Sequence, residues 1–369
     1  MSIITVYSSR QKQILQYVQK LQSEAILLMV PKNIYYFSGF LSEPHERFFA
    51  LYIDVQTEKT ILFVPSLDMD AAQAEAVVDE IIPVSDVENP YEIFKQSIGK
   101  VPVRFALEKS YMTISQVEQF NQQIPTFSYE DIETYIWQMR ANKSENEVAK
   151  VKQAITISEQ ALQHTWDQIK IGMTELEVKA ELEYQMTVLG ADAIAFETIV
   201  LSGKRAALPH GSAGDTKIDH GDFLLFDFGV TKDGYHSDLT RTCIVGEGTA
   251  EQRKMYETVR KANEQAIQTV TIGEKLQTID KAARSLIEEQ GYGKYFTHRI
   301  GHGLGLDVHE YPSIHANNEE FIQEGLLFTI EPGIYVPEIG GVRIEDDIYI
   351  TSEGKVEVLS SFTKELIYV

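Results

Sequence analysis

The chain has 369 residues, of which 43% are hydrophobic and 24% are charged, a composition typical of a globular protein long enough for two domains. It carries 33 basic and 55 acidic residues, a net charge of −22, so no binding to nucleic acid or to an anionic membrane surface is expected. No apolar run reaches bilayer-spanning length, the first residues lack a signal-peptide pattern, and Cys243 is the only cysteine. We therefore expect a cytoplasmic protein without disulfide bonds.

Helical and strand patterns alternate in the first third of the chain. Apolar spacing predicts a helix over residues 8–21, and strand-like runs follow at residues 24–30, 48–55, 60–65 and 105–108. This order predicts an α/β domain with a mixed sheet, which we place at residues 1–130. The loop at residues 39–47 is dense in ionisable groups. A solvated loop is one interpretation of it, because loops are polar in general.

The pattern changes in residues 131–369, where longer helices are separated by strands and glycine-rich turns. Three capping boxes predict the starts of three helices. Their residue pairs are Ser144 and Glu147, Thr174 and Glu177, and Thr249 and Gln252. A fourth helix is predicted over residues 276–290, before Gly291. Together with the strands, these helices predict an α+β domain in which helices pack on an antiparallel sheet.

Residues 223–245 (FLLFDFGVTKDGYHSDLTRTCIV) have the pattern of two strands joined by a tight polar loop at residues 231–234. With that loop, Asp227 faces Asp238 across the hairpin. Two carboxylates so placed repel each other, and an aspartate inside FLLFDF is costly to bury unless a positive charge compensates it. A bound metal cation is the simplest compensation. Two solvated aspartates on an open sheet face are the alternative.

Seven of the nine histidines fall between His210 and His315, and this clustering is more informative than any single histidine. Residues 298–310 contain three alternating glycines, too many for a stable helix, and these let the backbone pass close to another group. A dinucleotide-binding loop is a competing interpretation. The spacing is not G-x-G-x-x-G, however, and no strand-loop-helix pattern surrounds it.

Carboxylates also interrupt two later apolar runs. The run LLFTIEP places Glu331 where an apolar side chain is expected, and residues 341–350 predict a strand in which Arg343, Glu345 and Asp347 share one face. Two aspartates, two glutamates and one histidine form an oxygen-rich ligand set, which favours Mn²⁺, Co²⁺, Fe²⁺ or Zn²⁺ over a thiolate-type zinc site. Four carboxylates carry enough charge for two divalent cations, which together activate a bridging hydroxide.

These residues, in their order and local strings, resemble the pita-bread metallopeptidases, the family of prolidase, aminopeptidase P and methionine aminopeptidase. The residues in order are Asp227, Asp238, His302, Glu331 and Glu345, and the strings include SDLTRT, GHGLG, EPGIY and GVRIED. The resemblance covers essentially the whole chain. It implies an α/β creatinase-like N-terminal domain and an α+β pita-bread catalytic domain. It also implies that the five residues hold two divalent metal ions, with Mn²⁺ expected and Co²⁺ or Zn²⁺ as alternatives.

The resemblance gives roles to further residues. His210 matches a histidine near the scissile bond, His309 matches one that contacts the substrate carbonyl, and Glu331 matches a glutamate proposed as proton shuttle. Three more residues match catalytic, substrate-binding or supporting positions, namely Arg343, His298 and Tyr335. For two of these a purely structural role is the alternative: Tyr335 would then serve only for packing, and Arg343 only to orient a metal ligand.

The loop string Glu-Pro-His-Glu-Arg, which contains Glu43 and His45, resembles the Asp-Pro-His-Glu-Arg loop of prolidases from lactic acid bacteria. In those enzymes the loop reaches the active site of the partner subunit of a homodimer and is implicated in substrate selection there. Arg299 matches an arginine that is implicated in substrate selection together with that loop. Glu43 replaces the aspartate of that group and adds one methylene.

The resemblance thus implies a homodimer that cleaves Xaa-Pro dipeptides through attack of a metal-bridging hydroxide on the carbonyl before proline. Aminopeptidase P, which removes the N-terminal residue from longer Xaa-Pro peptides, is the alternative enzyme. A catalytically silent binding protein with the same fold is the alternative outside enzymes.

Overall fold

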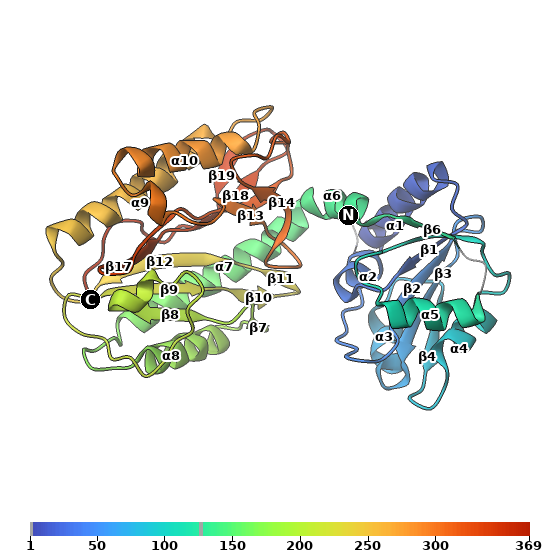
Figure 1. The fold of residues 1–369 in the computed structure, drawn as a ribbon. Coiled ribbons are helices and arrows are strands. Elements are labelled where there is room, and N and C mark those ends of the chain that lie inside the picture. Colours follow the sequence, from blue (N-terminus) through green and yellow to red (C-terminus); the bar gives the residue numbers. More distant parts are fainter. Residues whose placement is uncertain (1–2, 125–127) are drawn as a thin grey trace. The chain divides into compact units, whose positions relative to one another are not determined.

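The computed structural model describes residues 3–124 and 128–369 and divides into two compact units, Met1–Met139 and Arg140–Val369. Each unit is described by itself below, with the element labels of Figure 1. Among the described residues, no helix is both long and apolar enough to cross a membrane.

The first unit is built on a six-stranded sheet with the strand order β4-β3-β2-β1-β5-β6. Its strands are β1 (Ala25–Leu28), β2 (Ala50–Asp54), β3 (Thr60–Pro65), β4 (Glu80–Val84), β5 (Arg104–Leu107) and β6 (Ser128–Asp131). Its helices are α1 (Ile3–Lys20), α2 (Pro31–Ser38), α3 (Met69–Glu75), α4 (Pro90–Ser97), α5 (Ile114–Gln123) and all but the last two residues of α6 (Glu133–Ala141). Strand β1 pairs antiparallel with β2 and parallel with β5, so the mixed α/β sheet predicted from the sequence is confirmed.

The second unit contains two pairs of long helices and several antiparallel strand groups. The helices are α7 (Glu145–Trp166), α8 (Glu175–Val188), α9 (Ala250–Thr269) and α10 (Gln277–Glu289). The strands are β7 (Ala193–Ile194), β8 (Ile199–Ser202), β9 (Phe223–Phe228), β10 (Val230–Lys232), β11 (Tyr235–His236), β12 (Leu239–Ile244), β13 (Gly301–Gly303), β14 (Glu310–Ile314), β15 (Leu327–Ile330), β16 (Gly333–Val336), β17 (Gly340–Arg343), β18 (Asp346–Ile350) and β19 (Val356–Val358).

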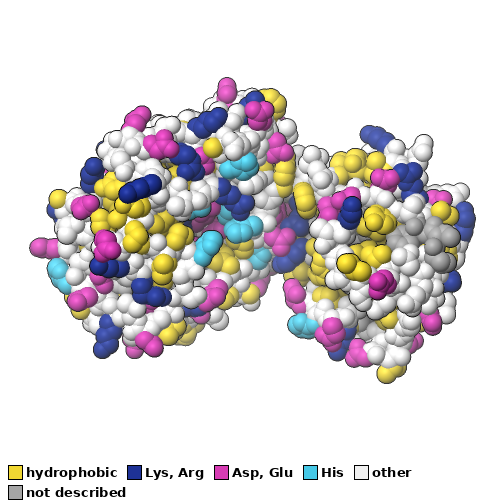
Figure 2. Space-filling view, in the orientation of Figure 1, with side chains coloured by type: hydrophobic (Ala, Val, Ile, Leu, Met, Phe, Trp, Pro, Cys, Tyr) yellow, Lys and Arg dark blue, Asp and Glu magenta, His cyan; other side chains and the backbone are white. Residues whose placement is uncertain are grey.

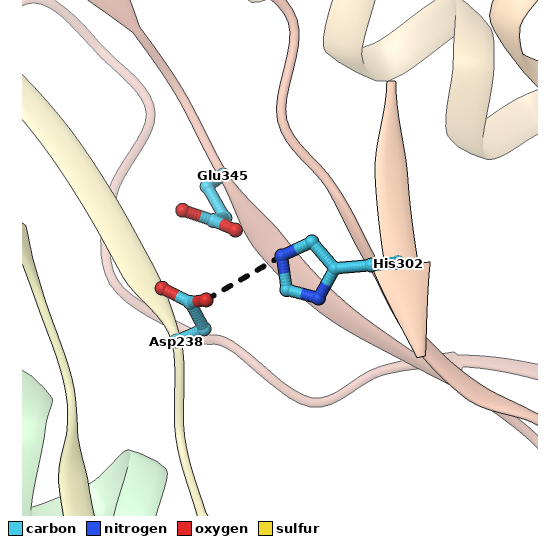
Figure 3. A group of neighbouring side chains, drawn as sticks. All are labelled: Asp238, His302 and Glu345. Carbon is cyan, nitrogen blue, oxygen red and sulfur yellow. Dashed lines mark ion pairs between the residues drawn. The ribbon is translucent and has the colours of Figure 1, made fainter. Parts of the chain in front are cut away.

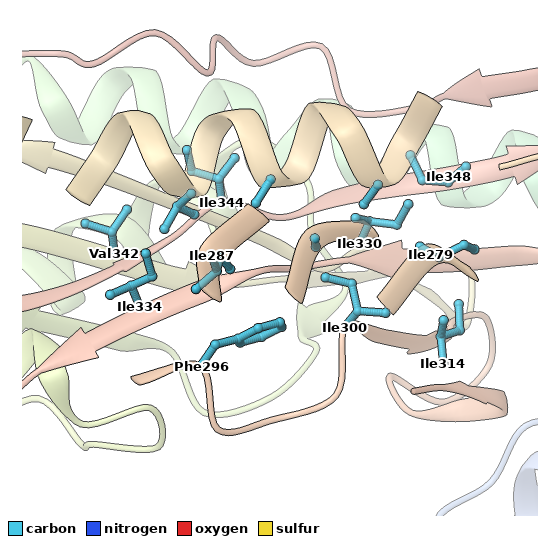
Figure 4. Close-up of a cluster of buried hydrophobic side chains, with 14 of the residues drawn as sticks. Ile279, Ile287, Phe296, Ile300, Ile314, Ile330, Ile334, Val342, Ile344 and Ile348 are labelled. Atoms are coloured by element: carbon cyan, nitrogen blue, oxygen red, sulfur yellow. The ribbon is translucent and has the colours of Figure 1, made fainter. Parts of the chain in front are cut away.

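Helices α9 and α10 lie on one side of these strands, and α7 and α8 lie on the other (Figure 1). Each helix pair contributes to its own apolar cluster. One cluster joins α9 and α10 to strands β15 to β18, with isoleucines such as Ile330 and Ile344 at its centre (Figure 4). The other joins α7 and α8 to β9 and β12. Burial of apolar surface on both sides therefore fixes the strands whose polar side chains form the site described below.

The three predicted capping boxes are confirmed. Thr174 Oγ1 accepts a hydrogen bond of 3.1 Å from the Glu177 amide, and the Glu177 carboxylate accepts one of 2.8 Å from the Thr174 amide. The corresponding bonds are present between Thr249 and Gln252, and the Ser144 amide donates to the Glu147 carboxylate at 2.9 Å. Each box satisfies amides that the first helical turn leaves without an intrahelical acceptor.

The predicted register of the hairpin at residues 223–245 is wrong by two residues. Thr231 pairs with His236 and Asp227 pairs with Thr240, so Asp227 does not face Asp238 directly. The turn contains only Asp233 and Gly234, which have φ angles of 49° and 78°. Two consecutive positive φ angles are typical of the tight type I′ turn that an Asp-Gly pair favours. A shift of two residues preserves the face of each side chain, so both aspartates still reach the same region.

Two other predicted strands are shorter than expected. Strand β15 ends at Ile330, so Glu331 follows the strand rather than lying inside it. The single strand predicted over residues 341–350 is two strands, β17 and β18, which belong to different sheets. Glu345 lies in the link between them, and its amide donates to the Thr240 carbonyl at 3.1 Å. The change of sheet removes Glu345 from a regular ladder and turns it toward β12.

Candidate active site

A cavity of about 440 Å³ in the second unit collects most of the residues singled out in the sequence. Its lining consists of Phe196, Ile199, Pro209, His210, Asp227, Asp238, His298, Arg299, His302, Val308, His309, Glu331, Arg343 and Glu345. In the space-filling view, histidine side chains gather on one face of this unit (Figure 2). The five residues predicted to hold metal therefore share one cavity, although they come from four separate parts of the chain.

Each of the five is placed at a strand or strand end. Asp227 lies in β9 and His302 lies in β13, and both strands are fixed by antiparallel pairing. Asp238 comes directly before β12, and Glu331 directly follows β15. Strand ends at the centre of a packed unit give short side chains fixed directions, which a multidentate site requires.

Asp238, His302 and Glu345 are buried, and one ligand atom from each lies within 4.8 Å of the other two (Figure 3). His302 Nε2 lies 3.7 Å from an Asp238 oxygen and 3.4 Å from a Glu331 oxygen. His302 Nδ1 lies 3.1 Å from the Gly303 carbonyl, so Nδ1 carries the proton and Nε2 presents its lone pair to the carboxylates. A neutral nitrogen that faces two carboxylates is an arrangement that suits a metal cation between them.

Burial and mutual repulsion dominate the electrostatics of this cluster. Burial, reinforced by the charge of Glu345, raises the pKa of Asp238 and of Glu331 well above the ordinary range. Burial and the charge of Asp227 raise the pKa of Glu345 to about 8. Burial also lowers the pKa of His302 to about 3, so this ring is neutral. The site thus disfavours both carboxylate anions and an imidazolium cation in the absence of an added positive charge.

Two buried carboxylate oxygens have no hydrogen-bond partner among the described residues, Glu345 Oε1 and Asp347 Oδ1. The other oxygen of Glu345 accepts a bond of 2.7 Å from Thr240 Oγ1. An unsatisfied buried carboxylate oxygen is costly, whereas coordination of a cation satisfies it. The donor set of four carboxylates and one imidazole therefore fits hard or intermediate divalent metal ions.

Arg343 is the buried cation that partly balances the carboxylates. It forms an ion pair with Asp227, and its Nη1 donates to the Tyr335 hydroxyl at 2.7 Å. The hydroxyl oxygen lies 2.8 Å from His298 Nε2. Because Tyr335 accepts from Arg343, its own proton goes to His298, whose Nδ1 lies 2.8 Å from the Arg299 carbonyl. Burial and the charge of Arg343 lower the pKa of His298 to about 4, in agreement with this neutral ring.

Two histidines reach the cavity from loops. His309 lies in the bend between β13 and β14, and its ring meets that of His302 edge-on with 4.1 Å between centroids. His210 follows a 3₁₀ turn (Gly203–Ala207). Glu175 fixes the loop around His210 by accepting hydrogen bonds from the Ser202 and Gly214 amides, at 2.8 Å and 2.9 Å. Both histidines are exposed.

Three of the predicted residues do not line the cavity. Tyr335 lies behind it, in contact with His298 and Arg343. Glu43 and His45 are exposed in a loop of the first unit, in which Arg47 pairs with Asp86 at 2.8 Å. The expected contribution of that loop to a neighbouring subunit stays a prediction.

Thr240 and the apolar wall of the cavity have no role predicted from the sequence. Thr240 donates to Glu345 and accepts a bond of 3.0 Å from Arg343 Nε, so it links two residues of the site. Side chains two residues apart in a strand share a face, so the position of Asp238 would have placed Thr240 on the face that carries the site. The wall residues Phe196, Pro209 and Val308 carry no local signal, because apolar residues in loops are common.

Comparison with known proteins identifies the family. The model described as metallopeptidase family M24 matches residues 149–352, and the model described as creatinase/prolidase N-terminal domain matches residues 10–142. A protein of Staphylococcus aureus described as an uncharacterized peptidase is 40% identical over 343 residues, which are 93% of this chain and 96% of that protein.

Three solved structures share both units of the fold. An Xaa-Pro dipeptidase from Bacillus anthracis has a TM-score of 0.91 at 31% identity and covers 98% of this chain and 100% of its own. A prolidase from Pyrococcus horikoshii has a TM-score of 0.90 at 35% identity, and the match covers 97% of this chain and 100% of that chain. An X-Pro aminopeptidase from Thermotoga maritima has a TM-score of 0.88 at 34% identity, and the match covers 98% of this chain and 100% of that chain. The predicted two-domain pita-bread fold is thereby confirmed, and the chain belongs to metallopeptidase family M24.

Proposed function

We propose that this protein is an Xaa-Pro dipeptidase, a prolidase, that works with two divalent metal ions held by Asp227, Asp238, His302, Glu331 and Glu345. The observation that carries the proposal is the unsatisfied buried oxygen of Glu345 within a cluster of carboxylates whose pKa values burial raises. Such a cluster is unfavourable unless cations occupy it. Mn²⁺ is the proposed metal, with Co²⁺ or Zn²⁺ as alternatives that the same ligands accept.

Divalent metal ions bound there would supply a water activated for attack and a Lewis acid for the scissile carbonyl. The protein residues supply the rest of the reaction. Glu331 takes the proton of the attacking water and passes it to the leaving proline nitrogen. The position of Glu331 in the cavity wall suits this transfer. His309 donates a hydrogen bond to the oxygen on which charge develops, and His210 contacts the peptide near the scissile bond.

Arg343 acts in this proposal by holding Asp227 in its ligand position. The ion pair and the hydrogen bond that Arg343 donates to Tyr335 restrict the guanidinium to one orientation, and Tyr335 in turn is fixed by His298. A metal ligand that is itself held by a second contact keeps its direction when the metal exchanges.

Arg299 supports the choice of a dipeptide over a longer peptide. It lines the cavity, donates to Ser313 Oγ at 3.1 Å and has no acidic partner among the described residues. A guanidinium without a carboxylate partner suits the free carboxylate of a C-terminal proline. We also propose that the protein is a homodimer and that the exposed loop with Glu43 and His45 contributes to substrate selection there, as the prolidase-like loop string suggests.

Similarity alone does not separate the two enzyme candidates, since relatives named as dipeptidase, prolidase and X-Pro aminopeptidase all resemble this chain closely. With Mn²⁺ present, we expect hydrolysis of Xaa-Pro dipeptides with a kcat/KM about tenfold or more above that for matched Xaa-Pro-Xaa tripeptides, because only the dipeptide offers its carboxylate at Arg299. Chromatographic assays of both substrate series measure this ratio. Faster cleavage of the tripeptides would identify an aminopeptidase P instead.

Asp238→Asn should remove a charged ligand from the centre of the site while preserving its shape. We expect loss of metal and a fall in kcat of about a hundredfold or more. Metal content by atomic emission and dipeptide hydrolysis measure the two effects. Asp215→Asn, at an exposed position outside the cavity, is the matched control and should change neither. Retention of full activity and metal by Asp238→Asn would refute the ligand assignment.

Removal of metal should make stability depend on pH. The folded chain keeps a proton on Glu345 up to a pKa of about 8, whereas an unfolded glutamate loses it near 4.5. The folded state then binds more protons between these values, so stability falls as pH rises through this window. Above pH 6.5, histidines of the unfolded chain are at most half protonated, so proton uptake by His298 and His302 on unfolding opposes this slope only in part.

We therefore expect the metal-free protein to lose about 1 kcal/mol of unfolding free energy between pH 6.5 and 8. Urea unfolding in EDTA measures this loss. Saturating Mn²⁺ should abolish the slope, because the metal binds the ionised carboxylates. Equal slopes with and without Mn²⁺ would contradict the role given to these groups.

A further inference from the structure

A buried group of charges lies at the start of the second unit, outside the cavity. We name Arg140, Lys143 and Glu310 the anchor cluster. The Glu310 side chain is 5% exposed, and Lys143 Nζ donates to one of its oxygens at 2.9 Å. Arg140 Nη2 donates to the other oxygen and also to the Asp307 carboxylate, the latter at 2.6 Å. Burial alone would raise the pKa of Glu310, but the charges of Arg140 and Lys143 lower it to about 2.

The anchor cluster is fixed to the fold on its cationic side. The Lys143 amide donates to the Gly325 carbonyl at 2.9 Å, and Asn142 forms a β-bridge with Leu326, directly before β15. Lys143 Nζ also donates to the Arg140 carbonyl at 2.6 Å. The two cations therefore have little freedom, and a residue that pairs with them acquires a defined position.

On its anionic side the cluster holds the loop at residues 304–309, which ends in His309. This loop forms neither helix nor strand, so it has no regular ladder of its own. Glu310 Oε1 accepts the amides of Leu306 and Asp307, at 2.8 Å and 3.1 Å. At Gly305, a Cβ atom would lie 2.7 Å from Lys143 Cε and 2.8 Å from Glu310 Oε2. The loop thus packs directly on the cluster, at a distance that only glycine allows.

We propose that the anchor cluster positions His309 for the reaction proposed above. The inference rests on that proposed function, because His309 has work to do only if the cavity binds and cleaves a peptide. Its effect reaches the substrate through the loop backbone, so Glu310 is a positioning residue that itself touches no reacting atom. Small displacements of a group at a reacting centre are costly, and a loop without ladder bonds needs such a restraint.

Glu310→Gln tests the proposal, because it keeps the length of the side chain and removes its charge. We expect kcat for an Xaa-Pro dipeptide to fall by about tenfold to a hundredfold, while KM changes by less than about threefold. In a His309→Ala background the same substitution should have almost no further effect on kcat, because the group that it positions is already gone. An equal fold decrease in kcat in both backgrounds would refute the proposal, since it would indicate that Glu310 has a general structural role.

Glu108→Gln is the matched control. Glu108 is also a buried carboxylate that accepts two backbone amides, from Met29 at 2.6 Å and Val30 at 2.8 Å, but it belongs to the first unit. The Glu108→Gln substitution should leave kcat within about twofold of its value without that substitution, both in the unaltered protein and in His309→Ala. If Glu310→Gln does not fold, Asp307→Asn removes only the half-exposed carboxylate of the same network, and it should lower kcat by a smaller factor with the same dependence on His309.

Hydrogen exchange of the metal-free protein tests the anchoring without any substrate. Glu310→Gln should speed exchange of the peptide that contains residues 304–309 by about tenfold or more, and exchange in β9 and β12 should be unchanged. Unchanged exchange of the loop would contradict the proposal. Absence of Xaa-Pro hydrolysis by the unaltered protein with Mn²⁺ would contradict the proposed function alone, and the exchange result would still decide whether the cluster holds the loop.

Discussion

The constraint on which the second unit depends is an excess of buried carboxylates. Asp238 and Glu345 are almost inaccessible, while Asp227 and Glu331 line the same cavity. Arg343 offsets one of these charges through Asp227. Burying the others without compensation would cost several kcal/mol each, more than a domain of ordinary stability tolerates. A protein that retains such a cluster at the wall of an accessible cavity uses it for binding, and divalent cations are the ligands that its donor atoms suit.

The fold supplies what such a site needs, which is rigidity behind the ligands and exposure in front of them. Apolar clusters on both sides of the strands fix the carboxylates from behind. The two histidines proposed to contact the substrate lie instead on loops, and buried ionic groups replace the missing ladder bonds there. Glu175 fixes the loop of His210, and Glu310 fixes that of His309. Loops held in this way combine reach with precision, a combination common at catalytic sites.

Much of this architecture could be predicted from residues alone. The capping boxes marked the helix starts because their hydrogen bonds are local, and Asp227 and Glu331 were noticeable because each breaks an apolar pattern. The hairpin register was wrong because the turn was assigned four residues, whereas Asp233 and Gly234 alone reverse the chain. The split at Glu345 was not predicted, since a change of sheet leaves no mark in strand periodicity. The pairing of Arg140 with Glu310 joins residues far apart in sequence, and no local pattern indicates it.

We propose above that the carboxylate cluster holds two divalent ions in each chain. The most direct measurement is a calorimetric titration of the metal-free protein with Mn²⁺ at neutral pH, with binding sites counted per chain. We expect two Mn²⁺ ions per chain and release of protons on binding, because carboxylates whose pKa burial raises must ionise to coordinate metal. Binding of one ion or none at saturation would contradict it.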